Sequence, residues 1–466
     1  MMFAEKLLNS YKAVSFDEVY LVPGLAEADP RSIDLNTRFS TNVKLLIPIA
    51  SSPMDTVTEL DMAVALALLG GIGVVHRNME TDRQVEIVKT IKMLPPVRTR
   101  ILYANIEEPC GRVLEVMYKH NVRNLPVVSN GKVVGCTHIA DLKDSCRKGL
   151  EPIPVKPCGT FRVTEAVRAR QELLKGTIDS VAFIDADGMY LGTFVFYDAF
   201  EDAQPAVDSE GRLVVGAAIS PFDKTRAIKL DRFVDVLVSD VAHFHNVEVL
   251  KEAKALVNEI ACDFIAGNIA TNKAVEDIVN TLEKVDGFRV GLGGGSICTT
   301  PEVTGAYIPT LYAVAKVRDA VDKIAPKTPV IADGGLRSPS DITKALAAGA
   351  SAAMLGYMLA GTDEASAPLI SIGGVKYKPY RGMASEGAMS RRFAVDRYAR
   401  VSKRVAEGVE GLVRYKGSVY NVVRNIIEAI KAGFGYVGAR NIEELWLKAQ
   451  FVIARKKHAE GLSLDI

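Results

Sequence analysis

The segment "PVIADGGLRSPSDITKALAAGASAAMLGYML" (residues 329–359) contains one complete strand–helix–strand unit. It begins and ends with apolar runs that stop at small or polar residues, and such runs are typical of strands buried on both faces of a parallel sheet. The stretch between them has the length and pattern of a helix, which Ser338 can cap and Gly349 can end. We therefore predict a parallel β-α-β unit over this segment.

The same alternation extends over most of the chain, with helix-length stretches such as 247–261 between short apolar runs. The runs expected to form strands are 45–52, 70–77, 212–220, 234–243, 263–271, 288–295, 329–336 and 352–359. Eight strands alternating with helices predict an α/β fold of the (β/α)8 TIM-barrel type, with its active site at the C-terminal ends of the strands. The residues at those ends form one candidate site: Ser52, Asp240, Asn268, Cys298, Asp333 and Gly356.

One connection is too long for a normal β-α loop, because more than 130 residues separate the second run from the third. Within it, residues 121–142 are echoed by residues 177–200. Each copy has an apolar strand, a turn, a second strand that opens with Gly, and an Asp six residues after that Gly. This internal repeat predicts a pseudo-symmetric inserted domain over 94–206, which divides the barrel into 1–93 and 207–466. A purely structural insert is the alternative to a ligand-binding one.

Composition argues against several classes of function. The 466 residues carry a net charge of +1, which gives no reason to expect nucleic acid or an anionic membrane as a partner. With no signal peptide and no apolar run long enough to span a bilayer, we expect a cytoplasmic protein. The six cysteines lack C-x-x-C or Cys/His ligand spacing, so we expect neither a disulfide framework nor a structural zinc. Glutamine occurs at only four positions, a weak indication of a heat-adapted source.

Three stretches of the candidate site carry chemistry. In "GLGGGSICTT" (291–300) a glycine-rich loop leads to Cys298, which is either a nucleophile beside a bound ligand or a buried structural thiol in a tight turn. In "DGG" (333–335) Asp333 either accepts hydrogen bonds from a ribose diol or caps the following helix. Residues 375–415 lie outside the barrel repeat and indicate an active-site flap, with a solvated basic helix as the alternative.

Seven motifs, in order, resemble those of the inosine-5'-monophosphate (IMP) dehydrogenase and GMP reductase family. They are "SSPMDTVTE" (51–59), "GGIGVVHRNM" (70–79), "GGGSICTT" (293–300), "ADGGLRSPSDITKALAAGA" (332–350), "YRGMAS" (380–385), "DRY" (396–398) and "EGVEG" (407–411). The resemblance covers nearly the whole chain, and the inserted repeat resembles a tandem pair of cystathionine-β-synthase (CBS) modules. It implies a TIM barrel with an inserted CBS pair, assembled into homotetramers that can stack into octamers.

The resemblance implies NAD-dependent oxidation of IMP to XMP. In the family a cysteine, here Cys298, attacks C2 of the purine, hydride passes to NAD, and water releases XMP from the resulting thioimidate. A flap pair activates that water, here Arg397 with Tyr398. A second route in the family uses a threonine and a flap glutamate, here Thr300 and Glu407.

The resemblance also implies binding residues. Substrate contacts fall on Ser52, Met54, Ser296, Asp333, Gly334, Gly335, Gly356, Tyr380, Gly382, Met383 and Glu407. Contacts with the nicotinamide cofactor fall on Asp240, Asn268, Gly291 and Gly293. Potassium would be bound by the carbonyls of Gly293, Gly295 and Cys298, completed in the family by a neighbouring subunit. In the insert, Thr137 with Asp141 and Thr193 with Asp198 fall where CBS modules hold the ribose of an adenine or guanine nucleotide.

Several positions depart from the dehydrogenase pattern. Val241 and Tyr357 stand where dehydrogenases usually have serine, and residues 299–310 lack the usual arginine, second glycine and glutamine. Val241, together with residues 358–364 and 385–389, favours GMP reductase, which deaminates GMP to IMP with NADPH. Tyr357 implies a differently arranged phosphate pocket, and the 299–310 loop bears on NAD binding. The Arg397–Tyr398 pair serves hydrolysis and therefore favours the dehydrogenase. A nucleotide-sensing barrel without catalysis is the third hypothesis.

Overall fold

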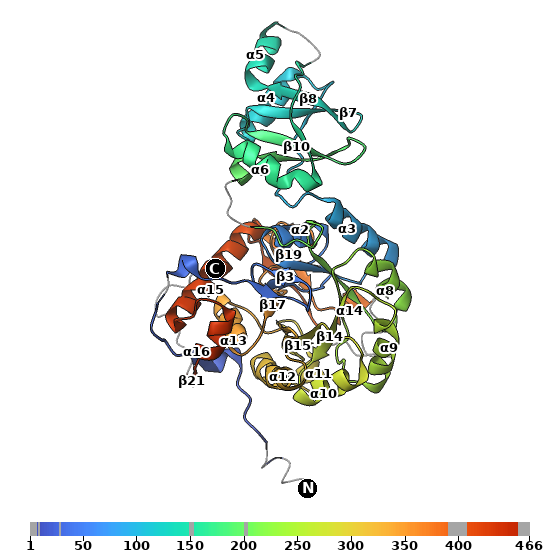
Figure 1. The fold of residues 1–466 in the computed structure, drawn as a ribbon, viewed down its shortest axis with the longest axis vertical. Helices are drawn as coiled ribbons and strands as arrows, with labels where there is room; N and C mark the ends of the chain where they lie inside the picture. The colour runs from blue at the N-terminus through green and yellow to red at the C-terminus, as the bar shows by residue number, and fades with distance from the viewer. Residues whose placement is uncertain are drawn as a thin grey trace. The chain divides into compact units, whose positions relative to one another are not determined.

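The computed structural model describes residues 7, 10–27, 29–148, 153–199, 204–389 and 408–454. The chain forms two compact units, one made of Met1–Lys89 with Val214–Ile466 and the other of Thr90–Leu213 (Figure 1). The boundaries that we expected for the insert, 94 and 206, lie inside the second unit. Each unit is described here by itself.

The first unit is built on a closed barrel of eight parallel strands. In order around the barrel these are β12 (Val215–Ile219), β13 (Val236–Ser239), β14 (Asp263–Ile269), β15 (Gly287–Val290), β16 (Val330–Asp333), β17 (Ala352–Leu355), β4 (Ile49–Ser51) and β5 (Ile72–Val75). Every expected apolar run overlaps one of these strands, so the predicted TIM barrel is confirmed. The long connection between β5 and β12 carries the second unit.

Helices surround the barrel, as Figure 1 shows. They are α2 (Leu60–Leu68), α3 (Thr81–Met93), α8 (Lys224–Asp231), α9 (Val247–Val257), α10 (Asn272–Thr281), α12 (Thr310–Ile324), α13 (Pro339–Ala347), α15 (Val419–Val437) and α16 (Ile442–Lys448). With helices on one face and the packed barrel interior on the other, strands such as β13 and β14 are buried along their whole length. That double burial explains why the strands read as continuous apolar runs rather than as alternating ones.

The β-α-β unit over 329–359 forms as its sequence predicts. The Ser338 side chain accepts a hydrogen bond from the backbone N–H of Asp341 at the start of α13. Gly349 follows the last turn with φ +102°, a conformation that side-chain-bearing residues rarely adopt. The helix is therefore fixed at both ends by the two residues that the sequence marked.

A small antiparallel sheet and two further strand pairs complete this unit. The sheet contains β18 (Ile370–Ile372), β19 (Val375–Arg381) and β20 (Glu410–Arg414), with the short helix α14 (Glu386–Met389) after β19. The pairs are β1 (Val19–Leu21) with β21 (Phe451–Ile453), and β2 (Thr37–Arg38) with β3 (Lys44–Leu45). The two ends of the expected flap thus form β19 and β20. Arg397, Tyr398 and Glu407 lie outside the described residues.

The second unit repeats one order of elements. Its first half contains β6 (Ala104–Asn105), α4 (Cys110–Lys119), β7 (Asn124–Ser129), β8 (Lys132–His138) and α5 (Ile139–Lys148). Its second half contains β9 (Thr160–Arg162), α6 (Ala166–Leu174), β10 (Ser180–Ile184), β11 (Tyr190–Val195) and α7 (Phe196–Ala199). Each half makes one three-stranded sheet with its own apolar core, so the repeat seen in the sequence is also a repeat of structure.

Two disulfides in the first half of this unit correct the expectation that no disulfide framework exists. Cys110 in α4 is bonded to Cys146 in α5, with Cα atoms 5.7 Å apart, and Cys136 in β8 is bonded to Cys158, with Cα atoms 5.4 Å apart. The partners are 36 and 22 residues apart in the chain, so spacing alone gave no indication of the pairing.

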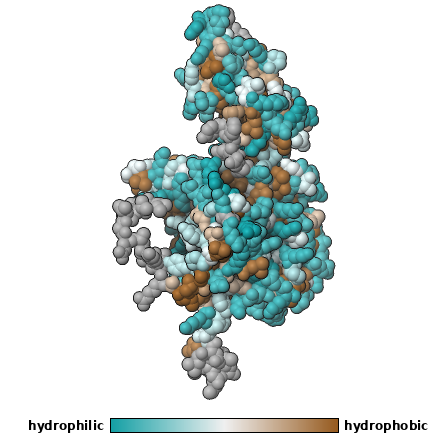
Figure 2. Space-filling model, turned by 60° about the vertical axis from the view of Figure 1, so that its left-hand side comes forward, coloured by the Kyte–Doolittle hydropathy of each residue, from teal (hydrophilic) through white to brown (hydrophobic). Residues whose placement is uncertain are grey.

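In the ranges that the structure covers, no helix combines the length and apolarity that crossing a membrane requires. Figure 2 shows hydrophilic side chains over most of the visible face, with apolar ones in small groups.

Candidate active site

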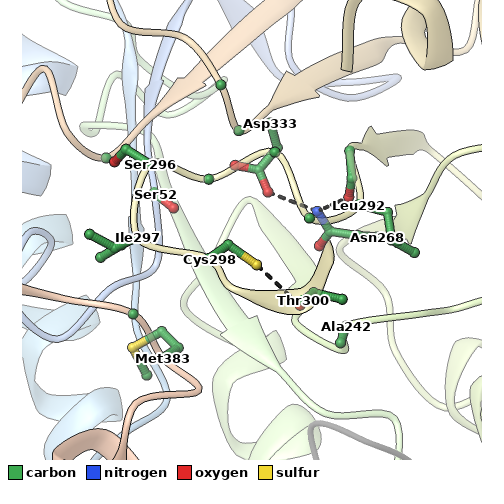
Figure 3. A pocket seen from close by; sticks show the side chains of 18 of the residues that line it. Ser52, Ala242, Asn268, Leu292, Ser296, Ile297, Cys298, Thr300, Asp333 and Met383 are labelled. Carbon is green, nitrogen blue, oxygen red and sulfur yellow. Dashed lines mark hydrogen bonds between the residues drawn. The ribbon is translucent and has the colours of Figure 1, made fainter. Parts of the chain in front are cut away.

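A cavity of about 400 Å³ opens at the C-terminal ends of the barrel strands (Figure 3). Every predicted residue of the barrel site that the structure describes lines it. These are Ser52, Met54, Asp240, Asn268, Gly291, Gly293, Gly295, Ser296, Cys298, Thr300, Asp333, Gly334, Gly335, Gly356, Tyr380, Gly382 and Met383. Barrel closure brings together residues that lie as far as 331 positions apart in the chain.

The loop after β15 places the Cys298 thiol at this cavity. Gly291 has φ +151°, and a Cβ there would lie 1.8 Å from the carbonyl oxygen of Asp333, so only glycine lets the two loops approach this closely. The backbone N–H of Cys298 donates to the carbonyl of Gly295 at 3.0 Å. The Cys298 Sγ lies 3.1 Å from the Thr300 hydroxyl, as Figure 3 shows. The thiol is partly exposed and faces the cavity, which argues against a buried structural role.

Two buried arginines organise the carboxylates beside this loop. Arg289 in β15 donates from Nε to Asp333 Oδ2 at 2.8 Å and from Nη1 to Asp240 Oδ1 at 3.1 Å. Arg77, just after β5, lies with its Nε 3.4 Å from Asp240 Oδ2 and donates to the Asp240 carbonyl oxygen at 3.1 Å. Asp240 is fully buried between the two guanidinium groups. The Asp240 carboxylate, which the family resemblance assigns to the cofactor, is thus a charge partner of two arginines at the wall of the cavity.

Asn268 links the two sides of the site. Its Nδ2 donates to the Gly291 carbonyl at 2.9 Å and to Asp333 Oδ2 at 2.8 Å. Its Oδ1 is buried and accepts no hydrogen bond from the described residues. A buried acceptor without a donor is costly, so this oxygen favours a ligand that carries an N–H or O–H donor. Asp333 meanwhile accepts both bonds on Oδ2, and the helix that follows it, α13, is capped by Ser338.

A second group of residues forms a cradle of glycines and hydroxyls. Gly334 and Gly335 after β16 have φ +92° and +80°. A Cβ on Gly356, after β17, would lie 2.9 Å from both Met54 Sδ and the Tyr380 hydroxyl. Burial raises the pKa of Tyr380 to about 12, which keeps the hydroxyl protonated as a donor. Backbone N–H groups and hydroxyls in a close-fitting cradle suit a phosphate group.

The chain on either side of the undescribed flap residues returns to the cysteine loop. Gly408 pairs with Cys298 in an antiparallel bridge, and the Val409 N–H donates to the Ile297 carbonyl at 3.0 Å. On the other side, Gly382 lies against Ile297 and Gly408. The residue that directly follows Glu407 therefore lies beside the candidate nucleophile.

Sequence reasoning missed Arg289 and Arg77, although both lie inside stretches that it singled out. The sequence did contain a signal for them, because an arginine within a strand that is buried on both faces needs an acidic partner inside the barrel. His243 also lines the cavity without having been predicted, and burial lowers its pKa. Of the two positions where dehydrogenases usually have serine, Val241 is fully buried, whereas Tyr357 lines the cavity and is 40% exposed.

The fold and the site define a (β/α)8-barrel enzyme class in which a cysteine loop, a carboxylate and a glycine cradle share one cleft. The IMP dehydrogenase / GMP reductase domain model matches residues 13–461. The chain belongs to this family.

Relatives in the family carry both activity names. The chain is 44% identical over 455 residues to the inosine-5'-monophosphate dehydrogenase of Korarchaeum cryptofilum, covering 95% of this chain and 94% of that protein. It is 40% identical to the corresponding enzyme of Thermoplasma acidophilum, covering 97% and 94%. Among solved structures, it is similar to a GMP reductase of Trypanosoma brucei in complex with guanosine 5'-monophosphate, with a TM-score of 0.75, 33% identity, and 98% and 100% coverage.

Proposed function

We propose that this chain is an IMP dehydrogenase that oxidises IMP to XMP with NAD, through a covalent intermediate on Cys298. The observation that carries the proposal is the position of the Cys298 thiol, which faces a cleft between the Asp333 carboxylate and the glycine cradle. The names of the curated relatives, which match nearly the full chain, support the same reaction.

The first step is addition of the Cys298 thiolate to C2 of the purine base. The thiol proton leaves, a C2–S bond forms, and the hydrogen on C2 departs with its electron pair, leaving a thioimidate. NAD, when bound, supplies the acceptor for that hydride. The Thr300 hydroxyl, 3.1 Å from Sγ, can stabilise the thiolate by hydrogen bonding.

The second step is hydrolysis of the thioimidate. Water adds at C2 and loses a proton, and the C2–S bond breaks to regenerate the thiol and release XMP. Thr300 and Glu407 form one candidate route for removing the proton, and the contact between Gly408 and Cys298 supports it. Arg397 with Tyr398 forms the other route. An arginine can act as a base only if its pKa, normally above 12, is strongly lowered.

The roles that the family resemblance assigns suggest positions for substrate and cofactor in the cleft, and the lining of the cavity supports them. The cradle of Ser52, Ser296, Gly335, Gly356 and Tyr380 would hold the 5'-phosphate. Asp333 and Gly334 would hold the ribose, and Met54, Gly382 and Met383 would lie along the base. The free acceptor of Asn268 fits the carboxamide of a nicotinamide, with Gly291 and Gly293 beside it and Asp240 behind it.

The carbonyls of Gly293, Gly295 and Cys298 suit potassium, because alkali cations prefer oxygen ligands and a carbonyl has two lone pairs. Gly295 uses one of its lone pairs for the Cys298 N–H and retains the other. These residues would hold the ion in the loop that carries the nucleophile.

The test is a pair of assays on the purified full-length chain. One contains IMP, NAD and potassium and follows NADH by absorbance, and the other contains GMP and NADPH. We expect steady NADH formation that is lost in Cys298→Ala, with IMP binding retained. An Arg397→Ala variant should form the covalent intermediate in one burst and then hydrolyse it slowly. A chain that binds nucleotide without turnover in either assay would favour the sensing hypothesis.

GMP reductase is the second candidate. Val241 and the similarity to a solved GMP reductase favour it. In that reaction the Cys298 sulfur would bond to C2 as ammonia leaves, which gives the thioimidate. Hydride, for which bound NADPH would be the source, would then add at C2 as the C2–S bond breaks and the thiol takes up a proton. NADPH consumption with release of one ammonia per turnover would replace the dehydrogenase proposal by this one.

For the insert we propose a CBS pair in which the first half is the better nucleotide site. Asp198 is buried and accepts two hydrogen bonds from Arg100, at 2.8 and 2.6 Å, while Thr193 donates to the Leu102 carbonyl at 2.5 Å. By contrast, the buried Thr137 hydroxyl has no partner in the part of the chain that the structure describes, and Asp141 pairs with Lys156 at 2.7 Å but stays partly exposed. We also propose that the chain is cytoplasmic and forms a homotetramer, two of which can stack into an octamer. Exposed apolar side chains on α16 and β21, such as Leu447 and Ile453, support self-association.

A further inference from the structure

Lys416 lies at the start of the chain that leaves β20, next to the loop that follows β17. Its Nζ donates to the carbonyl of Tyr357 at 2.7 Å and to that of Met358 at 3.2 Å. The ammonium also lies 4.8 Å from the centre of the Tyr357 ring, within the range of a cation–π contact. The side chain is thus partly buried against the backbone and the ring of one cavity-lining residue.

The Lys416 ammonium has neutral partners only. Within the described ranges, no carboxylate lies at ion-pair distance from it, and burial lowers its pKa to about 8. The two acids in the neighbouring loop have other partners. Asp363 accepts from the Tyr415 hydroxyl at 2.7 Å, and Glu364 accepts from the Ser418 hydroxyl and the Val419 N–H. A partly buried cation without a counter-ion favours an anion that arrives from outside the chain.

Tyr357 connects Lys416 to the cavity. This residue lines the cavity beside Gly356, and its ring lies 6.1 Å from that of Tyr380. The C=O and N–H of a trans peptide point in opposite directions. The Lys416 bond to the Tyr357 carbonyl therefore also fixes the N–H of Met358 on the opposite side of the same peptide. Lys416 controls the orientation of the loop that forms one wall of the glycine cradle.

We infer that Lys416 is a positioning residue for the 5'-phosphate of the nucleotide: it holds the loop after β17 in its binding conformation and supplies positive charge behind it. The inference rests on the proposed function in that it takes the cradle as the phosphate site. It holds for IMP and for GMP alike. Lys416 would compensate for the serine that Tyr357 replaces.

Binding is the suitable test, because it does not depend on turnover. Calorimetry would compare IMP with inosine and GMP with guanosine on the full-length wild-type chain, Lys416→Met and Lys416→Arg. Loss of one charged interaction with phosphate should weaken nucleotide binding by roughly tenfold to a hundredfold. Nucleoside binding, which involves no phosphate, should stay within about twofold, and the arginine variant should recover most of the lost affinity.

Lys378 in β19 provides a matched control. It is a buried lysine of the same small sheet, and its Nζ donates to the carbonyls of Asp363 and Ala365 at 3.0 and 2.8 Å, farther along the same loop. A Lys378→Met variant should change the affinities for nucleotide and nucleoside by the same factor. If Lys416→Met also changes the affinities for nucleotide and nucleoside by the same factor, Lys416 has only a structural role and the inference is wrong. It is also wrong if nucleotides and nucleosides bind equally well to the wild-type chain. Binding that follows our expectation, with no turnover in either assay, would refute the proposed activity and leave the phosphate role intact.

Discussion

The disulfide between Cys110 and Cys146 should contribute several kcal/mol to the stability of the inserted unit. It joins α4 to α5 at the edge of the core of the insert's first half, where both cysteines pack against the buried cluster. Closing a loop of 36 residues in the unfolded chain removes conformational entropy worth about 4 kcal/mol at 25 °C. The Cys136–Cys158 bridge closes 22 residues and is worth about 3.5 kcal/mol alone. The two loops overlap, so their joint contribution is smaller than the sum.

The expected consequence is a thermal transition that depends on redox conditions. The inserted unit spans Thr90–Leu213, and a unit of that size has an unfolding entropy of about 0.26 kcal/mol per kelvin. Loss of one bridge should therefore lower its melting temperature by about 15 °C. Scanning calorimetry of the full-length chain, with and without a phosphine reductant, measures the shift for loss of both bridges, which should be at least as large. The Cys110→Ser/Cys146→Ser variant should show most of it without reductant.

Two controls test the reasoning. Cys262→Ser changes a free thiol of the barrel unit and should leave the redox dependence unchanged. Thiol titration of the unfolded, unreduced chain should detect two free thiols, those of Cys262 and Cys298. Detection of all six cysteines as thiols, or a transition that shifts by less than a few degrees on reduction, would refute the reasoning.

Three further predictions concern the barrel. Arg289→Met should lower the free energy of unfolding by about 3–5 kcal/mol, because the Asp333 carboxylate then loses its guanidinium partner. Urea titration measures this change, and a value below about 1 kcal/mol would contradict the prediction. Gly291→Ala should lower the free energy of unfolding by about 3 kcal/mol or more, because the added Cβ would collide with the Asp333 carbonyl. It should also slow alkylation of the Cys298 thiol. A variant with wild-type stability and a wild-type alkylation rate would argue against so close an approach of the two loops. Burial raises the pKa of the Asp55 carboxyl, but the Arg381 and Asn78 hydrogen bonds outweigh that effect and hold it below its usual value of 3.8. Its stabilising contribution is therefore fully present above pH 3.8 and is lost on further acidification, a dependence that an Asp55→Asn variant should lack in acid unfolding curves.

The sequence by itself determined that the chain forms a barrel and which residues lie at the barrel's site. Strands buried on both faces must be apolar throughout, so their runs could be counted without coordinates. Because a barrel aligns the C-terminal ends of all its strands, the residue after each run could be assigned to one cleft. Ser52, Cys298, Asp333 and Gly356 were placed together in this way, and the structure brings them to one cavity.

Only the tertiary structure decided which of these groups are paired and which are free. Arg289 pairs with Asp240 and Asp333 at once, whereas the Asn268 Oδ1 has no donor among the described residues. The disulfide partners and the contact between Lys416 and Tyr357 likewise join segments that no local pattern relates. Periodicity records which face of an element is buried, because burial repeats along the chain. Pairing depends on distances across the fold, which are fixed only when the barrel closes and the loops pack against one another.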